Sequence, residues 1–273
     1  MISLILTKRM IMKTSPKNSD KERSDVCCFI SEYAARLLGC GATCIRIEKN
    51  VRRIAASYGF DTNVTVLPSH IIATVSDPRS GEQLSLVRPI AKSGINFAMN
   101  TSLSRLSWEI ADKKIPLAEA RKKFAAILSR KLTSSVEVLV LTSFANASFC
   151  RLFGGDIMAM IVVFTVTFIG FRIKQMMLEA HRDVRLTFLV AAFVSASLSA
   201  ACQLFHIGNT PDIAVGTSIL YLIPGVPYIN VVSDMLDHHY LCAFSRFIDA
   251  CILTACLSLG LCFGMLILNI EWF

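Results

Sequence analysis

The spacing of apolar residues along the chain changes several times before residue 133, and after it the apolar residues form long continuous runs. Two early segments, 25–38 and 43–58, have helical spacing, and each is followed directly by a glycine that fits a helix C-cap. The period then shortens toward two, which predicts strands over 63–67, 71–76 and 83–89. Helical spacing returns over 95–113 and 117–132. The predicted order of this part is ααβββαα.

The second half of the chain contains five apolar runs, and each is long enough to cross a hydrocarbon core of about 30 Å. The runs cover residues 135–153, 157–173, 186–205, 213–232 and 241–268. The fourth is interrupted by the sequence Pro224-Gly225-Val226-Pro227, so no regular helix is expected to pass through it. We therefore predict an all-α membrane domain of five transmembrane helices, the fourth of them broken.

These patterns divide the chain into three parts. Residues 1–22 are polar and predict a disordered tail, residues 23–132 an α/β cytoplasmic head, and residues 133–273 the transmembrane domain. Many secondary transporters are built from paired repeats with the binding site between them. A single set of five spans without an internal repeat resembles half of such an arrangement.

The charge of the chain is concentrated before the first span. Residues 1–131 carry 22 of the 28 Lys and Arg residues against 11 acidic residues, and the rest of the chain carries 6 against 9. Basic residues next to a first span favour retention in the cytoplasm, so the pattern predicts a cytoplasmic N-terminus and, after five spans, an external C-terminus. The lipid bilayer explains this basic excess, and nucleic acid is not expected as a partner.

Ten cysteines are present, but their spacing matches neither a zinc site nor a thioredoxin motif. Several lie in the last apolar run, where a thiol serves as a small apolar filler. The sequence therefore predicts no metal site and no cofactor. Nothing in the head marks a catalytic nucleophile either, so the chain is not expected to be an enzyme.

The interruption of the fourth run is the main candidate for a binding site. Pro224, Gly225 and Pro227 predict an unwound segment, and broken backbone within a bilayer is tolerated where it lines a cavity or is buried in protein. The N-terminus of the half-helix that follows would favour an anion such as a carboxylate. The alternative is a proline kink that only shapes helix packing.

Two polar residues follow the interruption on one face of the second half-helix, Asn230 and Asp234. Asn230 is a candidate for orienting the ligand. Asp234 is a candidate for carrying a coupled proton, because acids inside membranes are costly and are usually functional or paired. Alternatively, Asp234 is a solvated residue at the cytoplasmic interface.

Three further residues in the apolar runs complete the predicted site. Arg246 is the candidate contact for a substrate carboxylate, and Asp249 either holds Arg246 or, with Asp234, takes part in proton coupling. The alternative for Arg246 and Asp249 is an intrahelical ion pair. Asn146 in the first run is a candidate substrate contact, with interhelical hydrogen bonding as the alternative.

The chain resembles the N-terminal component of the bacterial threonine/serine exporter family, in the split form that works with a smaller second membrane subunit. The motifs that carry the resemblance are, in the head, Leu37-Leu38-x-Cys40-Gly41-Ala42-Thr43-x4-Glu48, Gly59, Val87-Arg88 and Gly94-Ile95-Asn96, and, in the membrane domain, Gly154-Gly155, Gly216, Leu222-Ile223-Pro224-Gly225-Val226-Pro227-x2-Asn230-x3-Asp234 and Arg246.

The resemblance implies an inner-membrane exporter of small carboxylate-bearing metabolites, either threonine and serine or dicarboxylates such as succinate. It also implies the second membrane subunit as a partner and leaves a higher oligomer open. One departure lies after Asp234, where the family pattern leads us to expect a glycine and this chain has Asp237-His238-His239.

Two functions from other classes remain as alternatives. One is a membrane-anchored hydrolase with its active site in the head, which predicts turnover by the fragment 23–132. The other is a non-transporting assembly or regulatory subunit whose partner holds the whole transport pathway.

Overall fold

The structure is a computed structural model that describes residues 16–90, 94–130, 133–205 and 208–267. The chain forms two compact units. The first, called here the α/β unit, contains the chain up to Arg130 together with a short distant segment, Asp234–Cys242. The second, the helical unit, contains Lys131–Ser233 and the chain from Ala243 onward.

The α/β unit has the predicted order of elements. Its helices and strands are α1 Pro16–Gly39, α2 Cys44–Ser57, β1 Asp61–Val66, β2 His70–Ser76, β3 Gln83–Pro89, α3 Phe97–Lys113 and α4 Leu117–Leu128. Helix α1 begins at Pro16, inside the segment predicted as a tail, and residues 1–15 of that tail lie outside the described residues. Helix α4 ends at Leu128, four positions before its predicted end.

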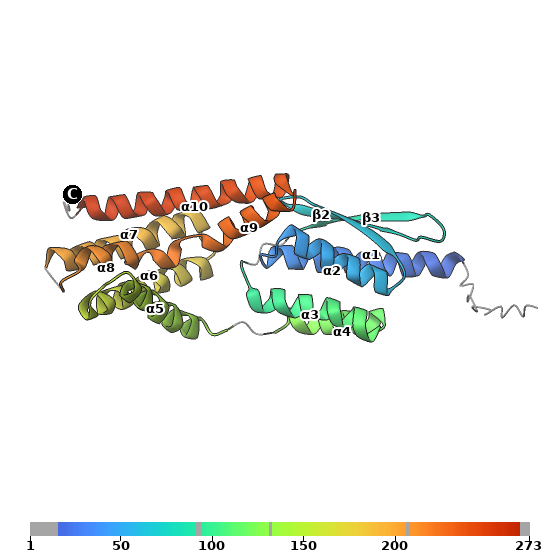
Figure 1. Cartoon of the computed structure of the whole chain (residues 1–273), viewed down its shortest axis with the longest axis horizontal. Coiled ribbons are helices and arrows are strands. Elements are labelled where there is room, and N and C mark those ends of the chain that lie inside the picture. Colours follow the sequence, from blue (N-terminus) through green and yellow to red (C-terminus); the bar gives the residue numbers. More distant parts are fainter. Residues whose placement is uncertain (1–15, 91–93, 131–132, 206–207, 268–273) are drawn as a thin grey trace, which may run out of the picture. The chain divides into compact units, whose positions relative to one another are not determined.

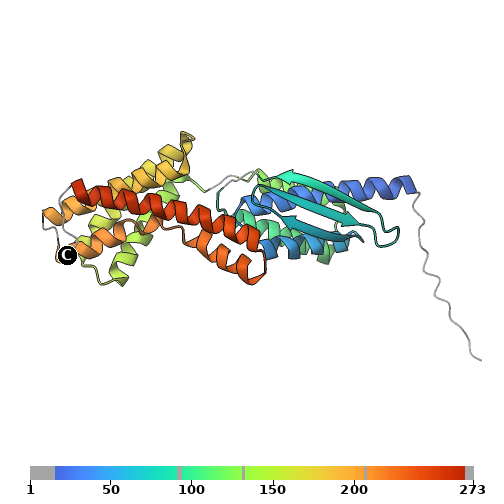
Figure 2. The same ribbon diagram turned by 90° about the horizontal axis from the view of Figure 1, so that it is seen from above.

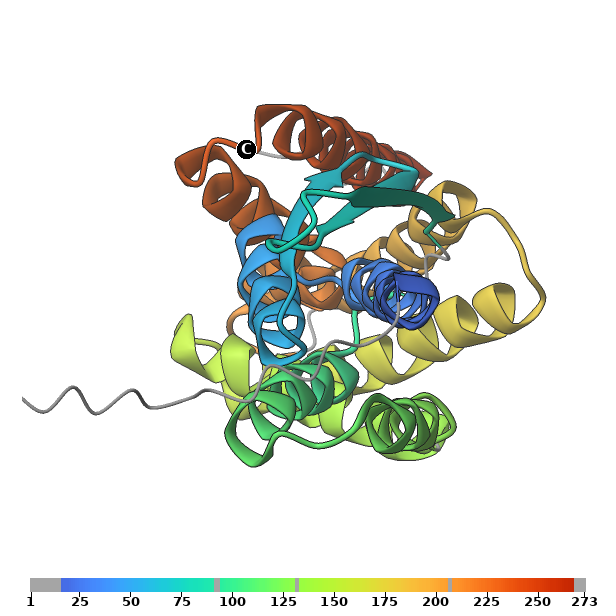
Figure 3. The same cartoon turned by 90° about the vertical axis from the view of Figure 1, so that its right-hand side faces the viewer.

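The α/β unit is built in layers. The antiparallel sheet has the order β1-β2-β3 (Figure 2), α1 and α2 pack against one of its faces, and α3 and α4 cover these helices on their other side (Figures 1 and 3). Ile71, Ala73 and Val75 alternate along β2 and are fully buried, as expected where every second residue of a strand faces a core. The alternation of apolar residues that the sequence predicts therefore identifies the side of the sheet that faces the helices.

A polar cluster lies within the core of this unit. The buried Tyr33 hydroxyl donates a hydrogen bond to the Leu103 carbonyl at 2.8 Å, and the Asn50 side-chain amide donates to the Tyr33 oxygen and to the Ser104 hydroxyl. Burial raises the pKa of Tyr33 well above its ordinary value, so this hydroxyl keeps its proton. The cluster ties α1 and α2 to α3.

The helical unit contains the apolar runs. Its elements are α5 Ser135–Leu152, α6 Ile157–Glu179, α7 Val184–Leu204, α8 Pro211–Ser218, the 3₁₀ turn η1 Leu220–Leu222, α9 Gly225–Leu236 and α10 Tyr240–Ile267. The last turn of α9 and the first of α10 belong to the α/β unit, because Asp234–Cys242 is part of that unit.

Three helices in the described part of the chain, α6, α7 and α10, are long and apolar enough to cross a membrane, and the bent pair α8–α9 counts as a fourth. The sequence predicts five spans, and the predicted span that these four do not include is α5. Helix α5 forms as predicted, but Glu137 and Arg151 near its ends lower its apolarity, together with Ser143 and Asn146 in its middle. Ser143 and Asn146 are buried, whereas Leu141 and Phe144 on the same helix are exposed.

Small residues bring α7 and α10 into close contact. A methyl group added at Gly260 would lie 2.4 Å from the Leu189 carbonyl oxygen, and one added at Gly264 would lie 2.7 Å from the Ala196 side chain. Glycine and alanine let helix backbones approach closely in membrane proteins. Ala196 on α7 therefore lies at this helix contact.

The turn between α9 and α10 contains a residue in the left-handed region, His238, with a φ of 63°. This conformation is costly for residues other than glycine. His238 lies in the segment Asp237-His238-His239, where the family resemblance leads us to expect a glycine.

Candidate functional site

The fourth apolar run is broken where the sequence predicts it. The first half ends with η1 at Leu222, Ile223 is extended (φ −61°, ψ 124°), and α9 begins at Gly225. The two halves are bent by 58° (Figure 1). Because Pro224 and Pro227 have no amide hydrogen, a continuous helix would lack two of its hydrogen bonds here. The expectation of an interrupted helix is confirmed.

The backbone at the start of α9 differs from the open anion site that we expected. The Gly225 amide donates to the Ile223 carbonyl at 2.8 Å, and the Tyr228 amide donates to the Pro224 carbonyl at 3.3 Å. Pro227 has no amide hydrogen to offer. These bonds leave the Val226 amide as the donor at this helix start, so side chains have to supply most of any anion-binding capacity.

Asn146 connects three helices beside the break. Its side-chain amide lies in the core of the helical unit, where it donates to the Thr167 hydroxyl on α6 at 2.6 Å and to the Thr217 carbonyl on α8 at 3.1 Å. Thr217 lies in the last turn of α8, where carbonyls have no partner within their own helix. The interhelical hydrogen bonding considered for Asn146 is therefore observed, and its contact with substrate stays a prediction.

A second polar pair packs against α6 at Gly170, one helical turn after Thr167. The hydroxyls of Ser195 on α7 and Tyr221 in η1 are 2.9 Å apart. Gly170 on α6 faces this pair, and a methyl group added there would lie 2.3 Å from both oxygens. Glycine at this position thus makes the room for a hydroxyl pair directly before the break.

The second half-helix contacts α10 near its start. The Tyr228 and Thr254 hydroxyls are 2.9 Å apart. Arg246 precedes Thr254 by eight residues, so its Cα lies about 12 Å farther along the helix axis. Arg246 and Asn230 are partly exposed, and Asp249 is exposed. Arg246 therefore lies along α10 away from the contact of that helix with the start of α9.

Asp234 belongs to the α/β unit. It is fully buried, and its carboxylate accepts a hydrogen bond from the Cys44 backbone amide at 2.8 Å. His239 lies 3.4 Å from Glu48 in the same region. Two sequence motifs that are 190 residues apart thus meet at the N-terminus of α2. Proton coupling by Asp234 stays a prediction.

One group of side chains in the described ranges has the donor atoms and spacing for a metal ion. Cys44, Asp234 and Cys242 each offer one ligand atom within 4.8 Å of the others, and all three residues are buried. Thiolate and carboxylate ligands would suit a zinc ion, which usually takes four ligands. The spacing of these cysteines in the sequence gave no signal of this group.

At the other end of α6, a tight turn forms at Gly154-Gly155-Asp156, with Gly154 at a φ of 89°. The Asp156 carboxylate accepts hydrogen bonds from the Ala159 and Asn209 amides and caps α6. Bonds from the Asn209 and Ala159 amides hold the pKa of Asp156 below its ordinary value. This turn joins α6 to the segment before α8.

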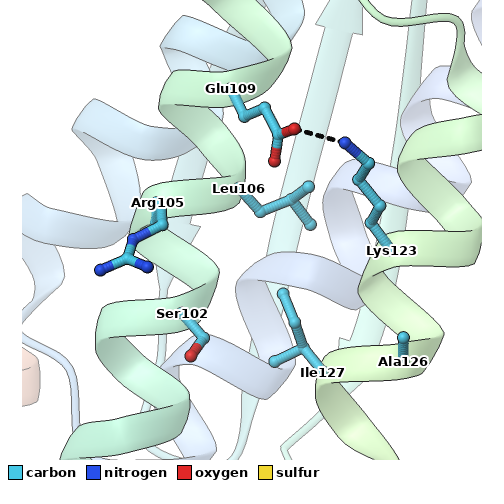
Figure 4. A pocket seen from close by; sticks show the side chains of 7 residues that line it. All are labelled: Ser102, Arg105, Leu106, Glu109, Lys123, Ala126 and Ile127. Atoms are coloured by element: carbon cyan, nitrogen blue, oxygen red, sulfur yellow. Dashed lines mark hydrogen bonds and ion pairs between the residues drawn. The ribbon is translucent and has the colours of Figure 1, made fainter.

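The α/β unit has a shallow groove of about 290 Å³ between α3 and α4 (Figure 4). Its lining residues are Ser102, Arg105, Leu106, Glu109, Lys123, Ala126 and Ile127. The ion pair between Glu109 and Lys123 crosses it and lowers the pKa of Glu109. The lining contains one hydroxyl, that of Ser102, and its lysine, Lys123, forms ion pairs with Glu109 and Glu119.

Sequence reasoning did not single out Thr167, Thr217 and Tyr221. Each is one polar residue in an apolar run, and such residues more often form helix contacts than sites. Their positions held a weak signal, since Thr217 and Tyr221 both lie within eight residues before Pro224. Only the packing of α5, α6 and α7 around the break brings them together.

Comparisons with known proteins agree with one another. The profile of the threonine/serine exporter family (ThrE) matches residues 28–268. A protein of Klebsiella aerogenes named "Probable succinate transporter subunit YjjP" is 27% identical over 244 residues, covering 88% of this chain and 92% of the relative. The Escherichia coli K12 protein of the same name is 26% identical over 239 residues, covering 86% and 90%. No solved structure matches the chain.

Proposed function

The chain belongs to the threonine/serine exporter family, and from this premise we propose that it is one subunit of an exporter of small carboxylate-bearing metabolites. The proposed substrates are dicarboxylates such as succinate, after the names of the two relatives, or threonine and serine, after the family. The chain works as a transporter and not as an enzyme.

The observation that carries this proposal is the break at Ile223-Pro224 beside a buried polar cluster. Asn146, Thr167 and Thr217 form interhelical hydrogen bonds in an otherwise apolar unit. Unwound backbone and buried polar groups are expensive in a bilayer, and both are common where a transporter binds its substrate. Each feature alone fits helix packing, but together they favour a substrate pathway.

Five spans are proposed, with α5 as the first. Helix α5 buries Ser143 and Asn146 while it exposes Leu141 and Phe144, which is the distribution expected of a helix between lipid and a polar bundle interior. The basic excess of residues 1–131 favours a cytoplasmic α/β unit. Five spans then place the C-terminus outside the bacterial inner membrane.

A second, smaller membrane subunit is proposed as the partner. The relatives are named as transporter subunits, and five spans without a repeat agree with half of a two-part pathway. In this proposal Pro224, Gly225 and Pro227 form the unwound segment and Asn230 orients the ligand. Arg246 contacts a substrate carboxylate, and Asp234 and Asp249 are the candidates for proton coupling.

The test is transport by the purified chain in liposomes, with and without the proposed smaller membrane subunit. Labelled succinate and threonine are followed separately, and export that needs both chains is expected. No transport of either compound by the pair would contradict the proposal. Transport by the partner alone would favour the regulatory alternative, and ester or amide turnover by the full chain would favour the hydrolase.

A matched pair of variants tests the break itself. Pro224→Ala together with Pro227→Ala restores the missing amide donors and favours a straight helix. Gly216→Ala is the control, because a methyl group there meets nothing within 4 Å. Export should fall in the double variant and persist in the control. Full export by an inserted double variant would show that the break is only a packing kink.

A further inference from the structure

One basic side chain of the helical unit is held by aromatic rings. Lys174 lies on α6 and is partly buried. Its ammonium nitrogen is 5.5 Å from the centre of the Phe171 ring and 4.7 Å from the centre of the Phe188 ring on α7. Both distances are within the range of cation–π attraction. The rings fix the position of the charge without neutralising it.

Two other basic residues of the helical unit have oxygen partners. Arg172 lies 3.9 Å from Glu179, and Arg151 donates to the Gly155 carbonyl at 3.1 Å. Within the described residues, Lys174 forms no ion pair with a carboxylate. An ammonium group has three donors, and cation–π contacts leave them available for an anion. Lys174 is therefore suited to receive a carboxylate from outside the chain.

Lys174 also continues the polar face of α6. Thr167, Gly170 and Lys174 are spaced i, i+3 and i+7, so they lie on the same face of the helix. Thr167 bonds to Asn146, and Gly170 faces the Ser195–Tyr221 pair. The ring of Phe171 contacts the ring of Tyr221, with centroids 5.8 Å apart. The polar face of α6 therefore extends from the Ser195 and Tyr221 hydroxyls beside the break to the Lys174 ammonium group.

From this arrangement we infer that Lys174 binds a carboxylate group of the transported metabolite before it reaches the break. The inference rests on the proposed function and deepens it. In the proposed orientation Lys174 lies toward the cytoplasmic end of α6, where an exported anion arrives. The Ser195 and Tyr221 hydroxyls then offer the next hydrogen bonds along the face. The ligand class is a small mono- or dicarboxylate.

The experiment compares two neighbouring charges in the reconstituted two-subunit complex. Lys174→Gln removes the proposed contact, Lys174→Arg keeps a cation, and Arg172→Gln removes a charge that is already paired. Transport of labelled succinate and threonine gives KM and maximal rate for each protein. A lost charged hydrogen bond predicts a rise in KM of about ten- to hundredfold for Lys174→Gln. Lys174→Arg and Arg172→Gln should stay near the wild type.

A second measurement uses the wild-type complex and needs no variant. Reductive methylation of lysines is followed by mass spectrometry with and without succinate, and dimethyl succinate serves as the control without carboxylates. Succinate, but not its diester, should slow modification of Lys174. If the substrate is threonine, then threonine should protect and threonine methyl ester should not.

The outcomes separate this inference from the proposed function. A wild-type complex that transports neither compound contradicts the proposed function. Transport by the wild type combined with an unchanged KM in Lys174→Gln overturns the inference alone. If Lys174→Gln does not insert, the protection experiment decides, and equal modification with and without transported substrate also overturns it.

Discussion

The carboxylate of Asp234 accepts a hydrogen bond from the backbone amide of Cys44 at 2.8 Å. Cys44 is the first residue of α2, and the side chain of Thr43 before it makes no capping hydrogen bond. A residue from the end of α9 thus supplies an anion to the N-terminus of α2, where the helix dipole favours negative charge. The interaction connects a motif after the break to a motif in the α/β unit.

Loss of this contact should destabilise the α/β unit. Replacing a capping side chain by alanine costs about 1–2 kcal/mol, so Asp234→Ala should lower the thermal unfolding temperature in detergent. Asp234→Asn keeps an acceptor oxygen and should lose less. Asp237→Ala, in the adjoining turn, is the control. Equal stability of Asp234→Ala and the wild type would contradict the capping role.

The same variants test proton coupling. If Asp234 carries the coupled proton, Asp234→Asn abolishes proton-dependent export although the protein remains folded and inserted. If Asp234 only caps α2, Asp234→Asn keeps most of the export while Asp234→Ala loses stability. Efflux measured at two external pH values separates the two roles, because only the first makes the pH dependence disappear.

Gly170 should not tolerate a side chain. Gly170→Ala places a methyl group 2.3 Å from the Ser195 and Tyr221 oxygens and forces their hydrogen bond apart. Overpacking of this kind costs about 1–3 kcal/mol. Gly216→Ala is the matched control on α8. A thermal stability of Gly170→Ala equal to that of the wild type would argue against this packing.

Asn146 and Thr167 should be energetically coupled. In a double-mutant cycle of Asn146→Ala and Thr167→Val, we expect a coupling of about 0.6–1.7 kcal/mol, as found for interhelical hydrogen bonds in membranes. Stability is measured by unfolding in detergent, with Thr165→Val as the control because the Thr165 hydroxyl bonds within its own helix. Strict additivity of the two substitutions would contradict the observed bond.

Two buried thiols should make the α/β unit sensitive to alkali. Burial raises the pKa values of Cys27 and Cys40 to about 11, from an ordinary value of 9.0. Since folding favours the neutral thiols, their stabilising effect is complete below pH 9 and is lost as the pH rises from 9 to 11. The loss is at most about 1.4 kcal/mol per pH unit for each thiol.

Alkylation rates check this prediction. Iodoacetamide should label Cys27 and Cys40 slowly at pH 8 and faster as the pH approaches 11, whereas the partly exposed Cys28 of the same unit serves as the accessible control. Labelling of all three at the same rate at pH 8 would show that the two thiols are not buried.

A cross-link tests the place of the α9–α10 turn in the α/β unit. The Cys44 and Cys242 sulfur atoms lie within 4.8 Å of each other, so a mild oxidant should join them as a disulfide without unfolding the chain. Peptide mapping identifies the linked pair, and Cys242→Ser removes it. Absence of the link under oxidation would place Cys242 away from α2.

The sequence by itself determined the element order, the division near residue 133 and the break in the fourth apolar run. These features follow from local rules, because side-chain period distinguishes helices from strands and proline removes an amide donor wherever it stands. The family also follows from the sequence, since its motifs occur at fixed positions in the chain. Charge distribution gave an orientation, which stays a prediction.

Tertiary structure alone decided which polar residues meet. Asp234 was expected on one face with Asn230, and that spacing holds, but its carboxylate contacts the start of α2, 190 residues away in sequence. Thr167 and Lys174 carry no local signal and Tyr221 only a weak one, because a single polar residue in an apolar helix gains meaning only from the helices packed around it. Such contacts depend on the packing of distant segments, and no local rule encodes that packing.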